Sequence, residues 1–189
     1  AVSRWSMDNT EVVESSGSDT ILEDFEKGEL GNGWSKGTVQ SSVVHDGDYA
    51  YRIDASNVTD GGVNTNSNLK QGDIFSTWMY ADFKGGSAEF HFAAQDTSDR
   101  PDNTYYIHFS EDGRAGIRKA KNNSDYTFLD RKEAGISGGK WYWIKVEWTA
   151  DGTISAKIED DSGNEVTTLE GSDTDFTSGY YGFVGFDCV

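Results

Sequence analysis

Cysteine, proline and basic residues are scarce in this sequence of 189 residues. It has one cysteine and one proline, and its 16 lysines and arginines stand against 33 aspartates and glutamates, for a formal net charge of -17. A single cysteine excludes an intrachain disulfide framework. Because so negative a field repels phosphate backbones and anionic lipid headgroups, we expect no nucleic-acid partner.

Long hydrophobic runs are also missing. No apolar stretch approaches the roughly 20 residues that a membrane-spanning helix needs, so we expect no direct membrane insertion. The first residues lack the hydrophobic stretch of a signal peptide, and any targeting segment is expected to have been removed or to lie outside this sequence. Glycine loops that cradle phosphate and cysteine or histidine spacings typical of zinc sites are absent too.

Aromatic residues, by contrast, are abundant: the chain has 6 tryptophans, 9 tyrosines and 10 phenylalanines. Disordered chains are poor in aromatic residues, so this composition predicts a folded protein. The acidic residues are dispersed over nearly every turn rather than gathered in one block. Such a surface resembles that of proteins from salt-loving organisms, in which carboxylates keep the folded surface hydrated.

Alternating apolar and polar residues dominate the chain, and helical periodicity is almost absent. This pattern indicates half-buried antiparallel strands. Turn-forming segments rich in glycine and aspartate separate the strands at 84–86, 111–114, 150–153 and 161–164. About a dozen strands with short loops predict an all-β fold, a two-sheet antiparallel jelly-roll sandwich. We expect one such domain over residues 20–189, preceded by residues 1–19 as an N-terminal arm or extra edge strand.

Several segments resemble known sandwich folds. The stretch 22–34 and the stretch 46–53 resemble the first strands of jelly-roll carbohydrate-binding modules. The stretch 139–154 and the closing residues 182–187 are similar to concanavalin A-like and laminin-G-like sandwiches. The resemblance spans residues 20–189 and implies a fold rather than a function, because this fold includes lectins, glycosidases, lyases and viral or adhesive modules.

Strand alternation assigns the residues of three consecutive predicted strands to two faces. One face carries core residues such as Phe75, Phe90 and Ile107, and the other carries aromatic and polar residues. Because the strands are joined by short connections, we expect them to be neighbours with one shared outer face. That face comprises Trp78, Tyr80, Glu89, His91, Gln95, Tyr106, His108 and Arg118.

Aromatic rings beside hydrogen-bonding groups suit a sugar, which has an apolar ring face for stacking and a rim of hydroxyl groups. Two of the 3 histidines fall on this face, which favours a ligand site. The alternative is that Trp78 and Tyr80 are covered by a loop or by the N-terminal arm, and that the histidines are ordinary cross-strand partners.

The same face has the residue types of a polysaccharide lyase, which uses a tyrosine or histidine as base and acid and a cation or amide to neutralise a uronate. His91, Tyr106, His108 and Arg118 supply these types. The charge of -17, however, repels an anionic polysaccharide unless salt screens it. The closely spaced carboxylates of sandwich-fold glucanases are missing. We therefore predict no catalytic residues and rank an enzyme below a binding module.

The resemblance also implies a structural calcium ion. Jelly-roll carbohydrate modules often bind Ca²⁺ where the first and last strands meet, through an early glutamate, a turn and a late aspartate. Carried over to this sequence, the ligands are Glu26, Asp46, Asp48 and Asp187. Hard oxygen ligands from separate segments are what Ca²⁺ requires. In so acidic a chain, the alternative is unpaired surface charge.

Together these observations predict an extracellular, non-catalytic glycan-binding or adhesive module of a cell-surface or virion protein. Its expected partner is a carbohydrate or a glycosylated cell surface. One alternative is a carbohydrate-active enzyme, either a polysaccharide lyase or a glycoside hydrolase. The other is a structural domain that assembles with further subunits.

Overall fold

A computed structural model describes residues 5–13, 19–55, 59–82 and 85–186. Within these ranges every regular element is a β-strand, and all the paired strands are antiparallel. No helix in the described ranges could cross a membrane. The predicted all-β class is confirmed.

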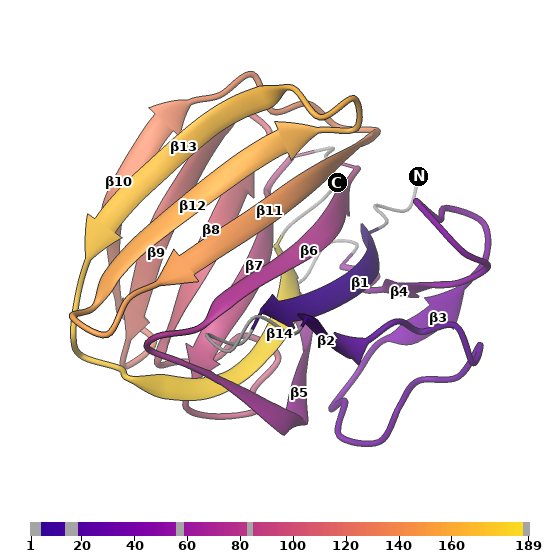
Figure 1. Ribbon diagram of the computed structural model, residues 1–189, viewed down its shortest axis with the longest axis horizontal. Helices are drawn as coiled ribbons and strands as arrows, with labels where there is room; N and C mark the ends of the chain where they lie inside the picture. Colours follow the sequence, from indigo (N-terminus) through magenta and orange to yellow (C-terminus); the bar gives the residue numbers. More distant parts are fainter. Residues whose placement is uncertain (1–4, 14–18, 56–58, 83–84, 187–189) are drawn as a thin grey trace.

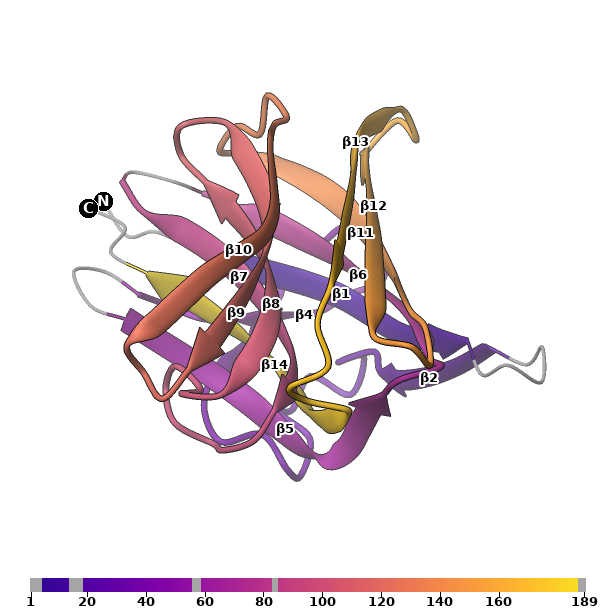
Figure 2. The ribbon, with the colours of Figure 1, turned by 90° about the vertical axis from the view of Figure 1, so that its left-hand side faces the viewer.

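The strands form two sheets that pack face to face, as the edge-on view of Figure 2 shows. Sheet A has the order β13 (Glu165–Ser172), β12 (Thr153–Asp160), β11 (Lys140–Trp148), β6 (Ile74–Ala81), β1 (Trp5–Val13), β4 (Ala50–Arg52) and β3 (Thr38–Gln40), with β2 (Asp19–Glu23) paired to β1. Sheet B has the order β10 (Asp125–Glu133), β9 (Arg114–Lys121), β8 (Thr104–Ser110), β7 (Ser87–Ala94), β14 (Ser178–Phe186) and β5 (Thr59–Lys70). This is the expected two-sheet sandwich.

Strand β1 lies inside sheet A (Figure 1). It pairs with β6 from Trp5 opposite Ala81 to Val13 opposite Ile74, and its Met7 lies opposite Tyr51 of β4. The description of the N-terminal segment as a loose arm or an edge strand is therefore wrong for residues 5–13. Insertion between β6 and β4 satisfies the backbone groups that either strand would otherwise leave unpaired.

Three of the predicted turns join neighbouring strands, and one does not. Those at Gly113, Gly152 and Gly163 connect neighbouring strands, and each glycine has the positive φ (87°, 88° and 78°) that favours this residue in a tight turn. Strands β6 and β7 do not form a hairpin, because β6 pairs with β1 and β11 whereas β7 pairs with β8 and β14. The chain between them passes from sheet A to sheet B, so the turn predicted at 84–86 does not join neighbouring strands. The predicted adjacency of these two strands is therefore wrong.

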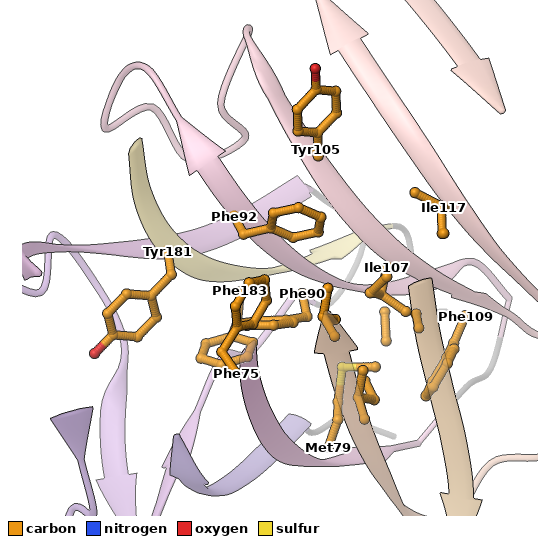
Figure 3. Packing of buried hydrophobic residues seen from close by; sticks show 14 of the residues in the cluster. Phe75, Met79, Phe90, Phe92, Tyr105, Ile107, Phe109, Ile117, Tyr181 and Phe183 are labelled. Atoms are coloured by element: carbon orange, nitrogen blue, oxygen red, sulfur yellow. The ribbon is translucent and has the colours of Figure 1, made fainter. Parts of the chain in front are cut away.

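The core lies between the two inner faces, where Figure 3 shows aromatic and aliphatic side chains from both sheets meeting. The ring of Phe75 on β6 lies 5.2 Å from that of Phe92 on β7, and Phe92 lies 5.6 Å from Trp148 on β11. Period-two alternation predicts Phe75, Phe90 and Ile107 on the inner faces, and their complete burial confirms it.

A second aromatic group anchors the segment that precedes β3. The ring of Trp34 lies 4.5 Å from that of Tyr51 and 5.7 Å from that of Phe25, and it also stacks on Phe183 of β14. Trp34 is only 9% exposed. These contacts make Trp34 an anchor for the early part of the chain.

Candidate functional site

The outer face of sheet B brings together most of the residues that were expected to bind a ligand. In the register of β7 and β8, Glu89 lies opposite His108 and His91 lies opposite Tyr106. Tyr106 in turn lies opposite Arg118 of β9. Directly opposed residues of antiparallel strands point to the same side of a sheet, so these five side chains share one face.

Trp78 and Tyr80 lie on the outer face of the other sheet. Because β6 belongs to sheet A, Trp78 is opposite Trp143 of β11, and their rings are 5.3 Å apart. The ring of His45 stacks on Trp78 at 3.7 Å. The prediction of one surface that includes Trp78, Tyr80 and the residues of sheet B is wrong, since the outer faces of two packed sheets point in opposite directions (Figure 2).

Gln95 does not belong to the group of side chains on the outer face of sheet B either. Ala93 has a φ of 56°, and this break in β7 ends the alternation on which the assignment of Gln95 depended. The Gln95 side-chain amide donates hydrogen bonds to the carbonyl oxygens of Ala93 (2.8 Å) and Ser178 (2.7 Å). Its side chain therefore links the end of β7 to the start of β14.

The centre of the outer face of sheet B is Glu89, whose side chain is completely buried. Its Oε2 accepts a hydrogen bond from Nε2 of His91 at 2.9 Å, and its Oε1 forms a 2.9 Å ion pair with Nη2 of Arg100. Nδ1 of His108 lies 3.4 Å from Oε1. Burial alone would raise the pKa of Glu89, but the two histidine hydrogen bonds and the Arg100 charge outweigh it and hold the pKa well below its usual range.

His91 and Tyr106 form the buried floor beside Glu89. Their rings are parallel within 5° and 4.6 Å apart, and neither residue is exposed. Burial lowers the pKa of His91 despite the hydrogen bond to Glu89, so the imidazole is neutral at pH 7 and its Nε2–H is the donor. Burial, reinforced by the charge of Glu89, raises the pKa of Tyr106 far above its usual range.

Two residues that the sequence analysis did not single out complete the site. Arg100, in the connection between β7 and β8, reaches over the sheet, and its Cζ lies 4.6 Å from the ring centroid of Tyr126. Tyr126 belongs to β10, which was not recognised as a strand. The alternation of Tyr126 and Phe128 with polar residues was a signal for that strand. No local pattern indicated that Arg100 would fold back onto the face.

Arg118 is held between aromatic rings. Its Cζ lies 4.5 Å from the Phe128 centroid and 5.4 Å from that of Tyr126. Gly116 makes room for this arrangement, because a Cβ there would come within 2.8 Å of the Phe128 ring. Nε of Arg118 is buried and has no hydrogen-bond partner among the described residues.

These side chains border a pocket with a volume of about 310 Å³. Its lining residues are Gly86, Ser87, Glu89, Arg100, His108, Arg118 and Tyr126. Glu89 is the single carboxylate among the described lining residues, and Arg100 neutralises it. The pocket thus offers a half-buried tyrosine ring, an imidazole and guanidinium groups, the types of group that orient a small polar ligand.

The predicted calcium ligands are only partly brought together. Oε2 of Glu26 accepts a hydrogen bond from the backbone N–H of Asp48 (2.9 Å), and Asp46 accepts one from the next amide of its own turn. Asp187 lies outside the described residues. Among the described residues, which include Glu26, Asp46 and Asp48, no group of three or more histidine, cysteine, aspartate or glutamate side chains is arranged to hold a metal ion. The calcium site stays a prediction.

Comparisons with known proteins bear on the fold. No protein-family profile and no curated protein matches the sequence. Among solved structures, the carbohydrate-binding module CBM66 from Bacillus subtilis is similar over 85% of this chain and 92% of its own, with 17% identity and a TM-score of 0.59. An endo-β-1,4-glucuronan lyase from the fungus Trichoderma reesei is similar over 84% of this chain and 81% of its own, with 20% identity and a TM-score of 0.50. The chain therefore has the jelly-roll β-sandwich fold that its sequence led us to expect.

Proposed function

We propose that this chain is a non-catalytic glycan-binding module and that its ligand site is the pocket on the outer face of sheet B. The observation that carries the proposal is the completely buried, ionised Glu89, fixed by His91, Arg100 and His108 beneath that pocket. Buried ion pairs rarely add net stability, because desolvation offsets the attraction. Such a group on the outer face, away from the hydrophobic core, is explained by a ligand that it helps to position.

The chemistry of the pocket suits a sugar. Tyr126 is half-buried, and the part of its ring that Arg100 and Arg118 leave exposed can contact the apolar side of a pyranose or furanose. His108 and Ser87 offer polar groups for the hydroxyls of the sugar. Because Glu89 and Arg100 hold each other in place, the polar groups are ordered before any ligand arrives. Binding then costs less conformational entropy than it would in a flexible loop.

Hydrolysis of a glycosidic bond is not supported by this site. A glycoside hydrolase generally uses two carboxyl groups, about 5–5.5 Å apart for retention or about 6.5–9.5 Å apart for inversion. The pocket has one, Glu89, and its oxygens are already engaged. We infer that this carboxylate has a positioning role.

A lyase is the second candidate, because His108 and Arg118 border the same pocket. Among the described residues, the site lacks a suitable proton donor for this reaction. Tyr106 is buried, has a raised pKa and accepts a hydrogen bond from Arg100 at 3.3 Å, so its hydroxyl is poorly placed to exchange protons with a substrate. Release of unsaturated uronates from mixed polysaccharides would overturn the non-catalytic proposal, and the absence of any release at high enzyme concentration is the expected result.

The test of glycan binding is an array of diverse glycans probed with the folded chain at high salt. We expect specific binding that is lost in His108→Gln and Tyr126→Leu, which alter the pocket wall. Trp143→Ala is the matched control, because it removes an aromatic ring from the outer face of sheet A. Equal loss in all three variants, or no binding by a protein whose cooperative unfolding is intact, would contradict the proposal. In the latter case light scattering should show an oligomer if the chain is instead an assembly domain.

We also propose that the module is extracellular, on a cell surface or a virion, where a glycan-binding or adhesive module meets its ligand. Its charge of -17 supports an origin in a salt-loving organism. We propose, in addition, that the module binds a structural calcium ion through Glu26, Asp46, Asp48 and Asp187. Running the array with and without a chelator tests it. Calcium-dependent binding together with a calcium-dependent melting temperature would support a metal site, and identical melting curves would reject it.

A further inference from the structure

We propose that the pocket selects an acidic sugar and that Arg118 contacts its anionic group. The inference rests on the proposed glycan-binding function and names its ligand class, a saccharide that carries a carboxylate or a sulfate ester. The starting observation is the distribution of arginine partners. Arg52, Arg100, Arg114 and Arg131 each form an ion pair with an aspartate or glutamate. Arg118 forms none with any residue that the structure describes.

An arginine without an acidic partner is unexpected in a chain in which 33 acidic residues face 16 basic ones. The aromatic contacts of Arg118 hold its guanidinium in place, with the Phe128 centroid 4.5 Å and the Tyr126 centroid 5.4 Å from Cζ. Stacking occupies the faces of a guanidinium and leaves its N–H edge for hydrogen bonds. Such an edge matches the paired oxygens of a carboxylate or a sulfate.

The local charge supports the same ligand. In the pocket lining, the charge of Glu89 is cancelled by Arg100, so the Arg118 charge is left over. The net charge of -17 opposes an anionic ligand at long range. At about 0.15 M salt, however, the Debye length is about 8 Å, so distant surface carboxylates are largely screened whereas direct contact is not.

The experiment compares chemically matched glycans at about 0.15 M salt and above. One pair is a uronic acid oligosaccharide and its carboxyl-reduced form, and the other is a sulfated oligosaccharide and its desulfated form. Affinity is measured by calorimetry with the wild-type chain, Arg118→Gln and Arg131→Gln. Arg131 is the matched control, because its Cζ also stacks on Phe128, at 4.8 Å, but it is paired with Asp112 and does not line the pocket.

We expect the wild-type chain to bind one acidic member at least tenfold more tightly than its neutral counterpart. Arg118→Gln should weaken that binding roughly 10- to 100-fold, as for loss of a charge-assisted contact, and Arg131→Gln should leave it unchanged. Which pair shows the preference identifies the anion. Equal affinity for the acidic and neutral members, or equal effects of the two variants, would overturn the inference while the proposed function stands. Failure of the folded chain to bind any of the four glycans, or any glycan on the array, would overturn both.

Discussion

On the outer face of sheet A, aromatic rings stack on one another while still partly exposed, whereas on the outer face of sheet B charged groups are buried under Arg100 and Tyr126. Trp78 is covered by the ring of His45 at 3.7 Å. Glu89 has no exposed side-chain surface. Both faces combine aromatic and polar residues, so a pattern of residue types does not distinguish them.

The two faces differ in how their side chains contribute to the free energy of folding. Partly exposed rings stabilise a sheet by stacking and by burying apolar area, and they need no further partner. A buried carboxylate stabilises the fold only while its partners stay in place. Stability alone therefore explains the outer face of sheet A, whereas that of sheet B requires a further explanation.

The largest expected effect comes from breaking the ion pair of sheet B. Arg100→Ala leaves the buried Glu89 without its cation, and removal of one partner from a buried pair costs about 3–5 kcal/mol. Denaturant unfolding monitored by tryptophan fluorescence measures it. Arg114→Ala is the control, because Arg114 is paired at the surface and should contribute little. Equal losses in the two variants would remove the distinction between this pair and a surface one.

A smaller loss is expected on sheet A. Trp78→Ala removes the stacking with His45 and Trp143 and should lower the free energy of unfolding by about 1–2 kcal/mol. Binding of glycans to the pocket of sheet B should be unchanged in this variant. Loss of glycan binding with an intact fold would show instead that the outer face of sheet A, and not that of sheet B, holds the ligand.

The dependence of stability on pH should also differ between the faces. Since burial lowers the pKa of His91 below the ordinary value of 6.5, the unfolded chain takes up a proton first, and stability falls as the pH drops below about 6.5. The lowered pKa of Glu89 adds a second loss as the pH falls below the unfolded value near 4.5. In His91→Gln, melting temperatures should fall less steeply through the first range. Trp143→Ala on the outer face of sheet A removes no titrating group and should keep the wild-type slope. A wild-type slope in His91→Gln would contradict the assignment.

The smallest expected difference between the two faces is in how the melting temperature depends on salt. Raising the salt from about 0.01 M to about 1 M shortens the Debye length from about 30 Å to about 3 Å, which screens repulsion among exposed carboxylates and should raise the melting temperature. The buried contact between Glu89 and Arg100 is screened much less. Arg100→Ala should therefore show the same rise as the wild-type chain. A melting temperature independent of salt would contradict the expected halophilic character.

The sequence located the strands better than it located the site. Glu89, His91, Tyr106 and His108 were placed on one face, because the strands that carry them are hairpin neighbours and obey strict alternation. The predicted placement of Trp78 was wrong, because a short glycine-rich connection can either close a hairpin or cross from one sheet to the other. The two kinds of connection have the same local sequence pattern. Arg100 and the ion pair that it forms with Glu89 were not predicted at all.

The sequence alone is enough to predict the all-β class, the inner faces of the strands that it identifies and most of the segments that turn. These features depend on period-two alternation and turn chemistry, which act between residues close in the chain. Contacts between segments distant in the chain decide which outer faces adjoin, that Arg100 covers Glu89 and that Arg118 has no acidic partner among the described residues. Those outcomes depend on strand pairing and loop closure between distant residues, and a local pattern does not contain that information.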